Sequence, residues 1–144
     1  MSLKFELDHI GIAVESLAGG KAFYETLGLG AMNTEKVPTE KVTVGMFELG
    51  NNARIELLEP TGADSEVAKF IEKRGPGIHH ICLKVSDLKA TMAALQAAGV
   101  KLTSDQPRPG AHGKLICFIH PKSTGGLLIE LSQPAPSSAD WSSM

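Results

Sequence analysis

The sequence has no apolar run long enough to cross a membrane. A spanning helix needs about 20 consecutive, mostly apolar residues, and charged residues interrupt every stretch of that length. The N-terminal residues also lack both the apolar core of a secretory signal and the Arg- and Ser-rich character of a transit peptide. We therefore expect a cytoplasmic protein with no membrane partner, or one of the mitochondrial matrix if a eukaryotic presequence has been removed.

Net charge and cysteine are also scarce. A formal charge of −2, with the two signs interspersed along the chain, gives no field able to hold a nucleic acid or an anionic membrane surface. The two cysteines, Cys82 and Cys117, lie in apolar runs without a Cys-x-x-Cys spacing. They are typical of buried free thiols in a reducing compartment. We therefore expect no nucleic-acid partner and no disulfide framework.

What the sequence does contain is an internal repeat. The segment DHIGIAV (8–14) returns 71 residues later as HHICLKV (79–85). The segment IELLEP (55–60) returns 74 residues later as IELSQP (129–134). A small insertion therefore separates two similar halves, and each half supplies one histidine and one glutamate.

Each half has the residue pattern of a βαβββ module. In the first half, a strand is followed by a helix that Ser16 can cap and Gly28 can end. The second half follows the same plan, with Ser86 as the expected cap and Gly99 as the end. Apolar residues at helical spacing predict a connecting helix between the modules. The expected strands are 5–14, 30–36, 42–49 and 53–59 in the first module and 79–85, 100–104, 114–120 and 127–132 in the second.

A chain of this length can bury one core, so we expect a single domain over residues 1–144. Module one covers about 5–60, the connecting helix about 64–74 and module two about 77–134. The tail 135–144 is rich in Ser, Ala and Pro and is expected to be flexible.

Four side chains of the repeat form a candidate metal site. Side chains alternate along a strand, so only one of His79 and His80 should face a shared interior, and the repeat assigns that role to His80, the equivalent of His9. Glu56 and Glu130 lie within apolar runs, where a buried carboxylate needs a cation or a hydrogen-bond network. The alternative is that these glutamates face solvent on a one-sided sheet.

These segments resemble the vicinal oxygen chelate superfamily over nearly all of residues 5–134. Within it, GIHHIC (77–82) and HPKSTGGLLIEL (120–131) are most similar to the methylmalonyl-CoA epimerase family. The resemblance implies a glyoxalase-like α+β fold, in which two tandem βαβββ modules form a mixed eight-stranded, partly closed sheet around a metal site. It also implies a homodimer.

The same resemblance implies an activity and a ligand set. The activity is epimerisation of (R)- and (S)-methylmalonyl-CoA, a coenzyme A thioester, at the carbon between the thioester and the carboxylate, through an enolate that a divalent metal ion stabilises. The metal ligands carry over onto His9, Glu56, His80 and Glu130. The residues do not choose among Co, Zn, Mn, Ni and Mg.

Proton removal also requires a base with a suitable pKa. Glu130 is the first candidate, although coordination to a cation would lower its basicity. A family glutamate on the third strand of module one aligns with Val44 here; Glu48 lies four residues along on the same strand face, and Glu40 lies just before the strand. Glu48 is therefore the candidate second base, and a one-base or water-mediated route is the alternative.

Three other functions are compatible with the fold. Glyoxalase I shares the His and Glu ligands but usually has a different turn before its last strand. A metal-free antibiotic-binding protein has no reason to keep four ligands, and in a ring-cleaving dioxygenase Glu56 would occupy a position that O₂ or substrate needs. The loop 108–114 is expected to be either a coenzyme A or carboxylate contact or a solvated turn.

Overall fold

The computed structural model describes residues 4–134 and contains one eight-stranded sheet in the order β2-β3-β4-β1-β5-β8-β7-β6. The strands are β1 (Glu6–Ala13), β2 (Asn33–Val37), β3 (Val42–Glu48), β4 (Arg54–Pro60), β5 (Gly77–Lys84), β6 (Arg108–Pro109), β7 (Leu115–Ile119) and β8 (Ile129–Gln133). The helices are α1 (Leu17–Thr26), α2 (Glu66–Arg74) and α3 (Leu88–Ala97).

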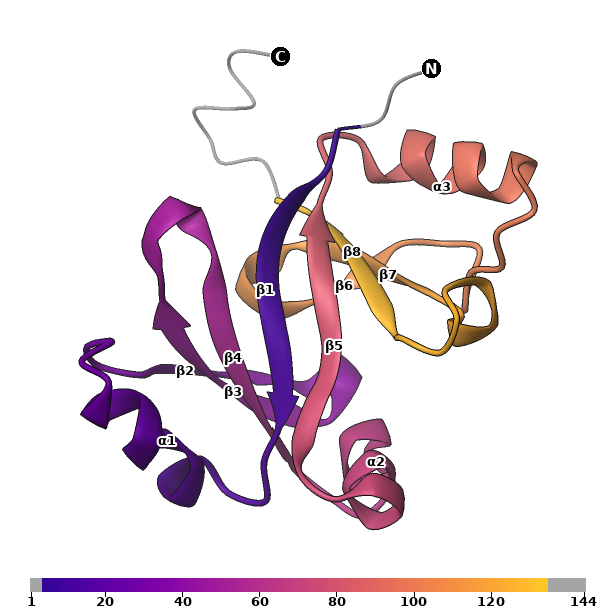
Figure 1. The fold of residues 1–144 in the computed structure, drawn as a ribbon. Coiled ribbons are helices and arrows are strands. Elements are labelled where there is room, and N and C mark those ends of the chain that lie inside the picture. Colours follow the sequence, from indigo (N-terminus) through magenta and orange to yellow (C-terminus); the bar gives the residue numbers. More distant parts are fainter. Residues whose placement is uncertain (1–3, 135–144) are drawn as a thin grey trace.

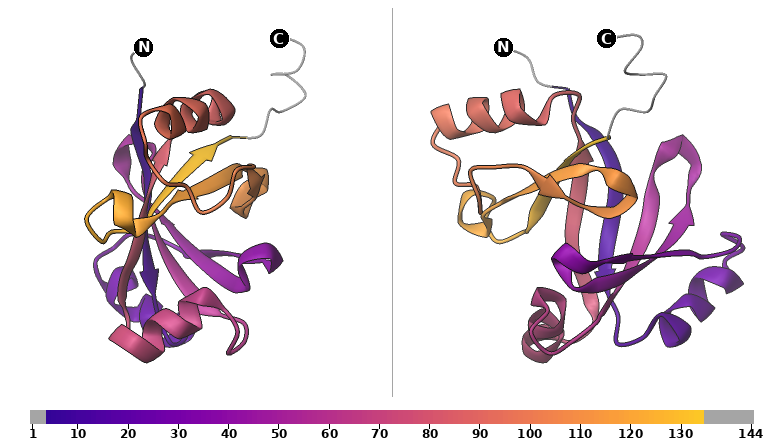
Figure 2. Two further views of the ribbon diagram at one scale, coloured as in Figure 1. Left: turned by 90° about the vertical axis from the view of Figure 1, so that its right-hand side faces the viewer. Right: turned by 180° about the vertical axis from the view of Figure 1, so that it is seen from behind.

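The first strands of the two modules, β1 and β5, pair antiparallel at the centre of the sheet (Figure 1). Each of them pairs in parallel with the last strand of its own module, β4 or β8. The remaining neighbours are antiparallel, and the two halves curl away from the central pair (Figure 2). The predicted mixed sheet of two βαβββ modules is therefore confirmed.

The helix starts follow from short polar side chains. Ser16 caps α1 as predicted, since its hydroxyl accepts a hydrogen bond from the Gly19 N–H. Asp87 caps α3 by accepting from the Ala90 N–H, so the predicted cap at Ser86 is wrong by one residue. Asp87 lies 71 residues after Ser16 and so keeps the offset of the repeat, which Ser86 does not.

The repeat also extends to contacts between helices and strands. The carboxylate of Glu59 accepts from the Leu17 N–H at 2.8 Å, and the amide oxygen of Gln133 accepts from the Leu88 N–H at 2.7 Å. Each last strand thus fixes the first residue of its own module's helix. α1 and α3 consequently lie at opposite ends of the sheet (Figure 1).

Each module packs its helix on its own strands. On the α1 side, Leu17 joins Phe47 and Leu57 in one buried cluster. On the α3 side the buried residues are Val85, Leu88, Met92, Cys117, Ile119 and Leu131. Cys82 and Cys117 are both buried and free, as predicted. A third buried cluster consists of Ala13, Val37, Val42, Val44, Met46, Leu58 and Val67, and several of these residues form the apolar part of the cavity that also holds the polar site residues.

The second module departs from the predicted strands at one place. Residues 100–104 form no strand, and only Leu102 makes an isolated bridge, to Ile119. The strand β6 is instead two residues long, because Pro107 and Pro109 have no N–H to donate to a neighbouring strand. The tail 135–144 lies outside the described residues. Within residues 4–134, no helix is both long and apolar enough to cross a bilayer.

Candidate metal centre and active site

Irregular pairing of β1 and β5 sets the directions of the site residues. Leu7 pairs with Leu83 and His9 with Cys82, which leaves Asp8 as an extra residue. Likewise Gly11 pairs with His80 and Ile12 with Ile78, which leaves His79 as an extra residue. Such β-bulges redirect side chains and break the alternation of a regular strand.

Because of the second bulge, His79 and His80 do not point to opposite faces. Their Nδ1 atoms are 2.9 Å apart, and both rings line the same cavity. The prediction that His79 turns away is therefore wrong. The alternation of side chains on which that prediction rests fails at a bulge, and no residue pattern around His79 indicates one.

Three of the predicted ligands meet at the concave face. His9 Nε2 lies 3.0 Å from His80 Nε2 and 3.2 Å from Glu130 Oε1, and His80 Nε2 lies 3.0 Å from the same oxygen. All three side chains are buried. Two imidazole nitrogens and a carboxylate oxygen that converge in this way match the donors that zinc and similar divalent ions take.

The far side of the His9 ring is held by a charged cluster. Asp8 accepts from His9 Nδ1 at 2.7 Å, from Arg54 Nη2 at 2.7 Å and from Lys114 Nζ at 2.9 Å. Burial opposes ionisation of Asp8, but these hydrogen bonds and charges outweigh it and hold its pKa well below the usual range. An ionised Asp8 fixes the proton on His9 Nδ1 and turns the Nε2 lone pair toward the cluster.

Cys82 also lies close to His9, and its thiol forms a second candidate ligand group with His9 and Asp8. The oxygens of Asp8 are already occupied by Arg54 and Lys114. Burial raises the pKa of the Cys82 thiol to about 11, so the thiol keeps its proton. His9, His80 and Glu130 therefore remain the better metal-binding group.

Glu130 is the carboxylate that both modules' histidines share. Burial disfavours its charge, yet the hydrogen bonds of His80 and His9 outweigh that cost and lower its pKa. Burial opposes the charged form of His9, but its hydrogen bonds with Asp8, Cys82 and Glu130 outweigh this effect and raise the pKa of His9. A proton on these histidines and a bound metal cation would therefore compete for the same place beside the Glu130 carboxylate.

Glu56, the fourth predicted ligand, lies beside this group. Its Oε2 accepts from Arg54 Nε and Nη2, both at 3.1 Å, and is 3.3 Å from His9 Nδ1. Arg54 lies two residues earlier on the same strand and therefore on the same face. Glu56 is buried in the cavity wall, but its place as a ligand stays a prediction.

The two glutamates considered as second bases lie in different surroundings. Glu48 is exposed at the end of β3, beyond the part of the strand that the cavity covers, so its position does not support a catalytic role. Glu40, in the short 3-10 helix Pro38–Glu40, lines the cavity. The sequence placed Glu40 just before the strand but did not indicate which way it faces.

Glu40 is held by a residue from the other module. Arg108 Nη2 donates to Glu40 Oε1 at 3.0 Å, while Glu40 Oε2 is buried without a hydrogen-bond partner among the described residues. Burial and the negative charge of Glu130 raise the pKa of Glu40, although Arg108 counteracts them. The Arg108 guanidinium also lies over the Phe118 ring, 5.4 Å from its centroid.

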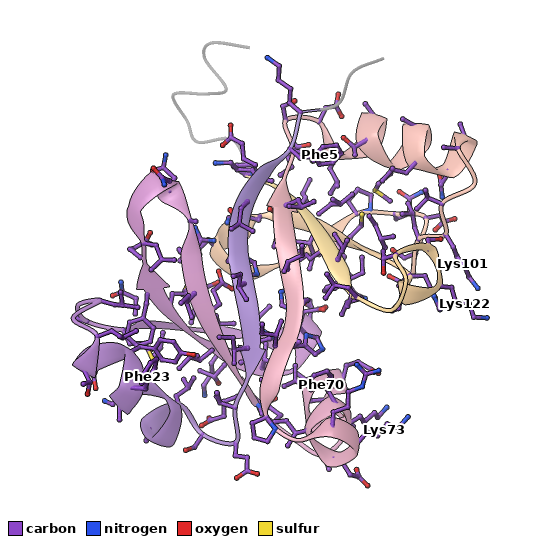
Figure 3. All side chains as sticks on the ribbon, in the orientation of Figure 1. Phe5, Phe23, Phe70, Lys73, Lys101 and Lys122 are labelled. Carbon is purple, nitrogen blue, oxygen red and sulfur yellow. The ribbon has the colours of Figure 1, made fainter. Side chains whose placement is uncertain are left out.

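The cavity that contains these groups has a volume of about 1010 Å³. The loop 108–114 supplies two cations to it, but Arg108 binds Glu40 and Lys114 binds Asp8. At its edge, α2 contributes Phe70 and Lys73 to the lining, and Figure 3 shows both on this helix beside β5. The cavity is thus lined by buried histidines and carboxylates with their paired cations, and on α2 by the exposed Lys73.

The fold and this ligand cluster define the class of the protein. Residues 8–118 match the family model described as the Glyoxalase/Bleomycin resistance protein/Dioxygenase superfamily. The chain belongs to this superfamily.

Relatives narrow the resemblance further. The chain is 44% identical over 130 residues to the ethylmalonyl-CoA/methylmalonyl-CoA epimerase of Cereibacter sphaeroides, covering 88% of this chain and 96% of that protein. The crystal structure of methylmalonyl-CoA epimerase from Mycobacterium tuberculosis superposes with a TM-score of 0.87 at 40% identity, covering 92% and 90% of the two chains.

A further solved structure is a methylmalonyl-CoA epimerase in complex with methylmalonyl-CoA and NH4+. It superposes with a TM-score of 0.85 at 37% identity and covers 93% of this chain and 96% of that one. These matches confirm the predicted resemblance to methylmalonyl-CoA epimerases and, with it, the expected class of enzyme.

Proposed function

We propose that this protein interconverts (R)- and (S)-methylmalonyl-CoA by removing and returning the proton on the carbon between the thioester and the carboxylate. The observation that supports this most is the convergence of His9, His80 and Glu130 on the floor of a cavity that also holds Glu40. The substrates in the names of the relatives support the choice of a coenzyme A thioester.

His9, His80 and Glu130 would hold one divalent cation. We propose Glu56 as a fourth ligand because it is the counterpart of Glu130 in the repeat and lines the same cavity. When bound, the cation supplies positive charge that stabilises negative charge developing on a nearby substrate oxygen. The donors present suit several divalent ions, so the identity of the metal stays open.

Glu40 is our candidate for the stronger base, in place of Glu48. A base works best when its pKa is close to the operating pH, and the pKa of Glu40 is raised whereas that of Glu130 is lowered. Arg108 occupies only one oxygen of Glu40, which leaves the other free to take a proton. Glu130 would serve as the second base, so that a proton leaves one face and arrives on the other.

We further propose that the protein acts as a homodimer in the cytoplasm, or in the matrix if it is a mitochondrial protein. The dimer rests on the resemblance to two-module members of the superfamily. The compartment rests on the coenzyme A substrate and on the two buried free thiols, which suit a reducing environment.

The proposal is tested by supplying one epimer of methylmalonyl-CoA to cobalt-loaded protein and measuring the appearance of the other. Wild-type protein should convert it. Glu40→Gln should lose at least about 100-fold in kcat/KM, because a positioned base contributes roughly 10²- to 10⁴-fold. Glu48→Gln is the matched control and should stay near wild type.

Two results would contradict the proposal. Turnover of the hemithioacetal of methylglyoxal and glutathione, without turnover of methylmalonyl-CoA, would make the protein a glyoxalase I. A loss of activity in Glu48→Gln with none in Glu40→Gln would return the base to Glu48.

A further inference from the structure

A second imidazole lies directly behind His80. The Nδ1 atoms of His79 and His80 are 2.9 Å apart, and on the other side of the His80 ring its Nε2 is 3.0 Å from Glu130 Oε1. A neutral imidazole has one N–H donor and one lone-pair acceptor. His80 can therefore donate from Nδ1 to His79, or from Nε2 to Glu130, but not both.

Only one of these tautomers can bind a cation at the cluster. A ligand nitrogen must offer a lone pair, and the His80 nitrogen that faces His9 and Glu130 is Nε2. The proton must then be on Nδ1, and the atom within reach of that proton is His79 Nδ1.

We propose that His79 is a positioning residue, which accepts the Nδ1–H of His80 and so keeps the Nε2 lone pair of His80 turned toward the metal centre. This inference rests on the metal centre of the proposed function, though not on the substrate. Hydrogen-bonded partners of this kind commonly set the tautomer and orientation of metal-bound histidines.

The position of His79 agrees with this role. It is the extra residue of a β-bulge, so the backbone turns it to the same side as the ligand that follows it. The bulge in β1 does the same with Asp8, whose carboxylate accepts from Nδ1 of His9 at 2.7 Å. Each ligand histidine thus has an acceptor supplied by the residue immediately before it.

The His79 ring is held in place by the connecting helix. Phe70 on α2 packs edge to face against it, with ring centroids 5.1 Å apart at an angle of 79°, and Figure 3 shows Phe70 beside β5. Packing on Phe70 is also the competing explanation for this histidine. The two explanations make opposite predictions for a pair of substitutions.

The test compares His79→Phe with His79→Asn. Phenylalanine keeps an aromatic ring against Phe70 but has no acceptor, whereas asparagine loses the ring but keeps an oxygen close to the place of Nδ1. The first readout is the tautomer of His80 in metal-free protein, from two-bond ¹H–¹⁵N NMR correlations of the imidazoles. The second is the dissociation constant for Co²⁺, measured by calorimetric titration.

In metal-free protein the Nδ1–H tautomer of His80 competes with the Nε2–H tautomer that donates to Glu130. Wild type and His79→Asn should therefore show the same share of the Nδ1–H tautomer and should bind Co²⁺ with similar affinity. His79→Phe should shift the proton toward Nε2 and weaken Co²⁺ binding by about 10- to 100-fold, the usual cost of losing such a partner. An unchanged tautomer and affinity in His79→Phe would overturn the inference, as would an equal loss in His79→Asn.

These readouts separate the inference from the proposed function. The NMR measurement needs neither metal nor substrate, so it decides the role of His79 even if methylmalonyl-CoA is not turned over. A protein that binds Co²⁺ and behaves as expected in both variants, but does not epimerise methylmalonyl-CoA, would contradict the proposed substrate alone.

Discussion

The two central strands present their ligand histidines in the same way but support them differently. In β1, Asp8 joins His9 to Arg54 and Lys114 in a buried ionic cluster. In β5, His79 takes the place of Asp8, and burial together with the nearby His80 lowers the pKa of His79 to about 4, so the ring is neutral. Both strands therefore have a bulge and a hydrogen-bond acceptor before the ligand histidine, but the acceptor is charged in Asp8 and neutral in His79.

The space beneath the two rings differs as well. His80 pairs with Gly11, and a Cβ atom at Gly11 would lie only 2.3 Å from His80 Cε1. His9 pairs with Cys82, the counterpart of Gly11 in the repeat, which is fully buried. One ring is thus held by charge and the other by close packing, and these differences can be tested separately.

The largest effect is expected at Glu130, where the two modules meet. Glu130→Gln removes the oxygen charge that both histidines contact, together with one proposed base. We expect a loss of about 10³-fold or more in exchange of the substrate α-proton with deuterated solvent, measured by ¹H NMR. The fold should persist in circular dichroism, and near wild-type exchange would remove Glu130 from the mechanism.

Asp8→Asn should break the ionic support of β1. It leaves Arg54 and Lys114 without their shared carboxylate, and removal of one member of a buried ion pair costs about 3 kcal/mol or more. Urea unfolding of metal-free protein at pH 7 would measure the change. His79→Asn is the matched control in β5 and should cost less than about 1 kcal/mol; equal losses would show that the two supports do not differ.

Gly11→Ala, on β1, should disturb the packing of the His80 ring on β5 and leave the charged cluster around Asp8 unchanged. The new methyl group must displace the His80 ring, so we expect Co²⁺ affinity to fall by about 100-fold, near the upper end for loss of ligand orientation. Cys82→Ala, the substitution at the same repeat position beneath His9, should change the affinity only slightly. Wild-type affinity in Gly11→Ala would mean that the His80 ring has room to move.

The smallest effect is expected from the hydrogen bond between Glu40 in the first module and Arg108 in the second. Arg108 opposes the rise in the pKa of Glu40, so Arg108→Gln should raise that pKa further. The base acts when deprotonated, and the acid limb of kcat/KM should therefore move to higher pH. A pH profile of epimerisation would measure the shift, and movement to lower pH would contradict the assignment of Glu40.

The repeat made the paired modules and the cluster of His9, His80 and Glu130 predictable. His9 and His80 are separated by the 71-residue offset of the repeat, so they occupy equivalent positions on β1 and β5. The apolar run around Glu130 indicated a buried carboxylate. The mixed sheet followed from the same βαβββ pattern. These features depend on local patterns that occur twice.

The parts that could not be predicted depend on irregular backbone or on distant partners. The bulge at His79 breaks the alternation on which its orientation was judged. Glu40 lines the cavity and is held there by Arg108, 68 residues away. No spacing rule in one sequence encodes such pairings.

The central claim is that one histidine from each module, His9 and His80, together with Glu130 forms a single metal centre. A Co²⁺ titration of wild type, His9→Ala and His80→Ala, followed by d–d absorption, tests it most directly. We expect one ion per chain in wild type and a large loss of affinity in both variants. Wild-type affinity in either variant, or two independent ions per chain, would contradict the account.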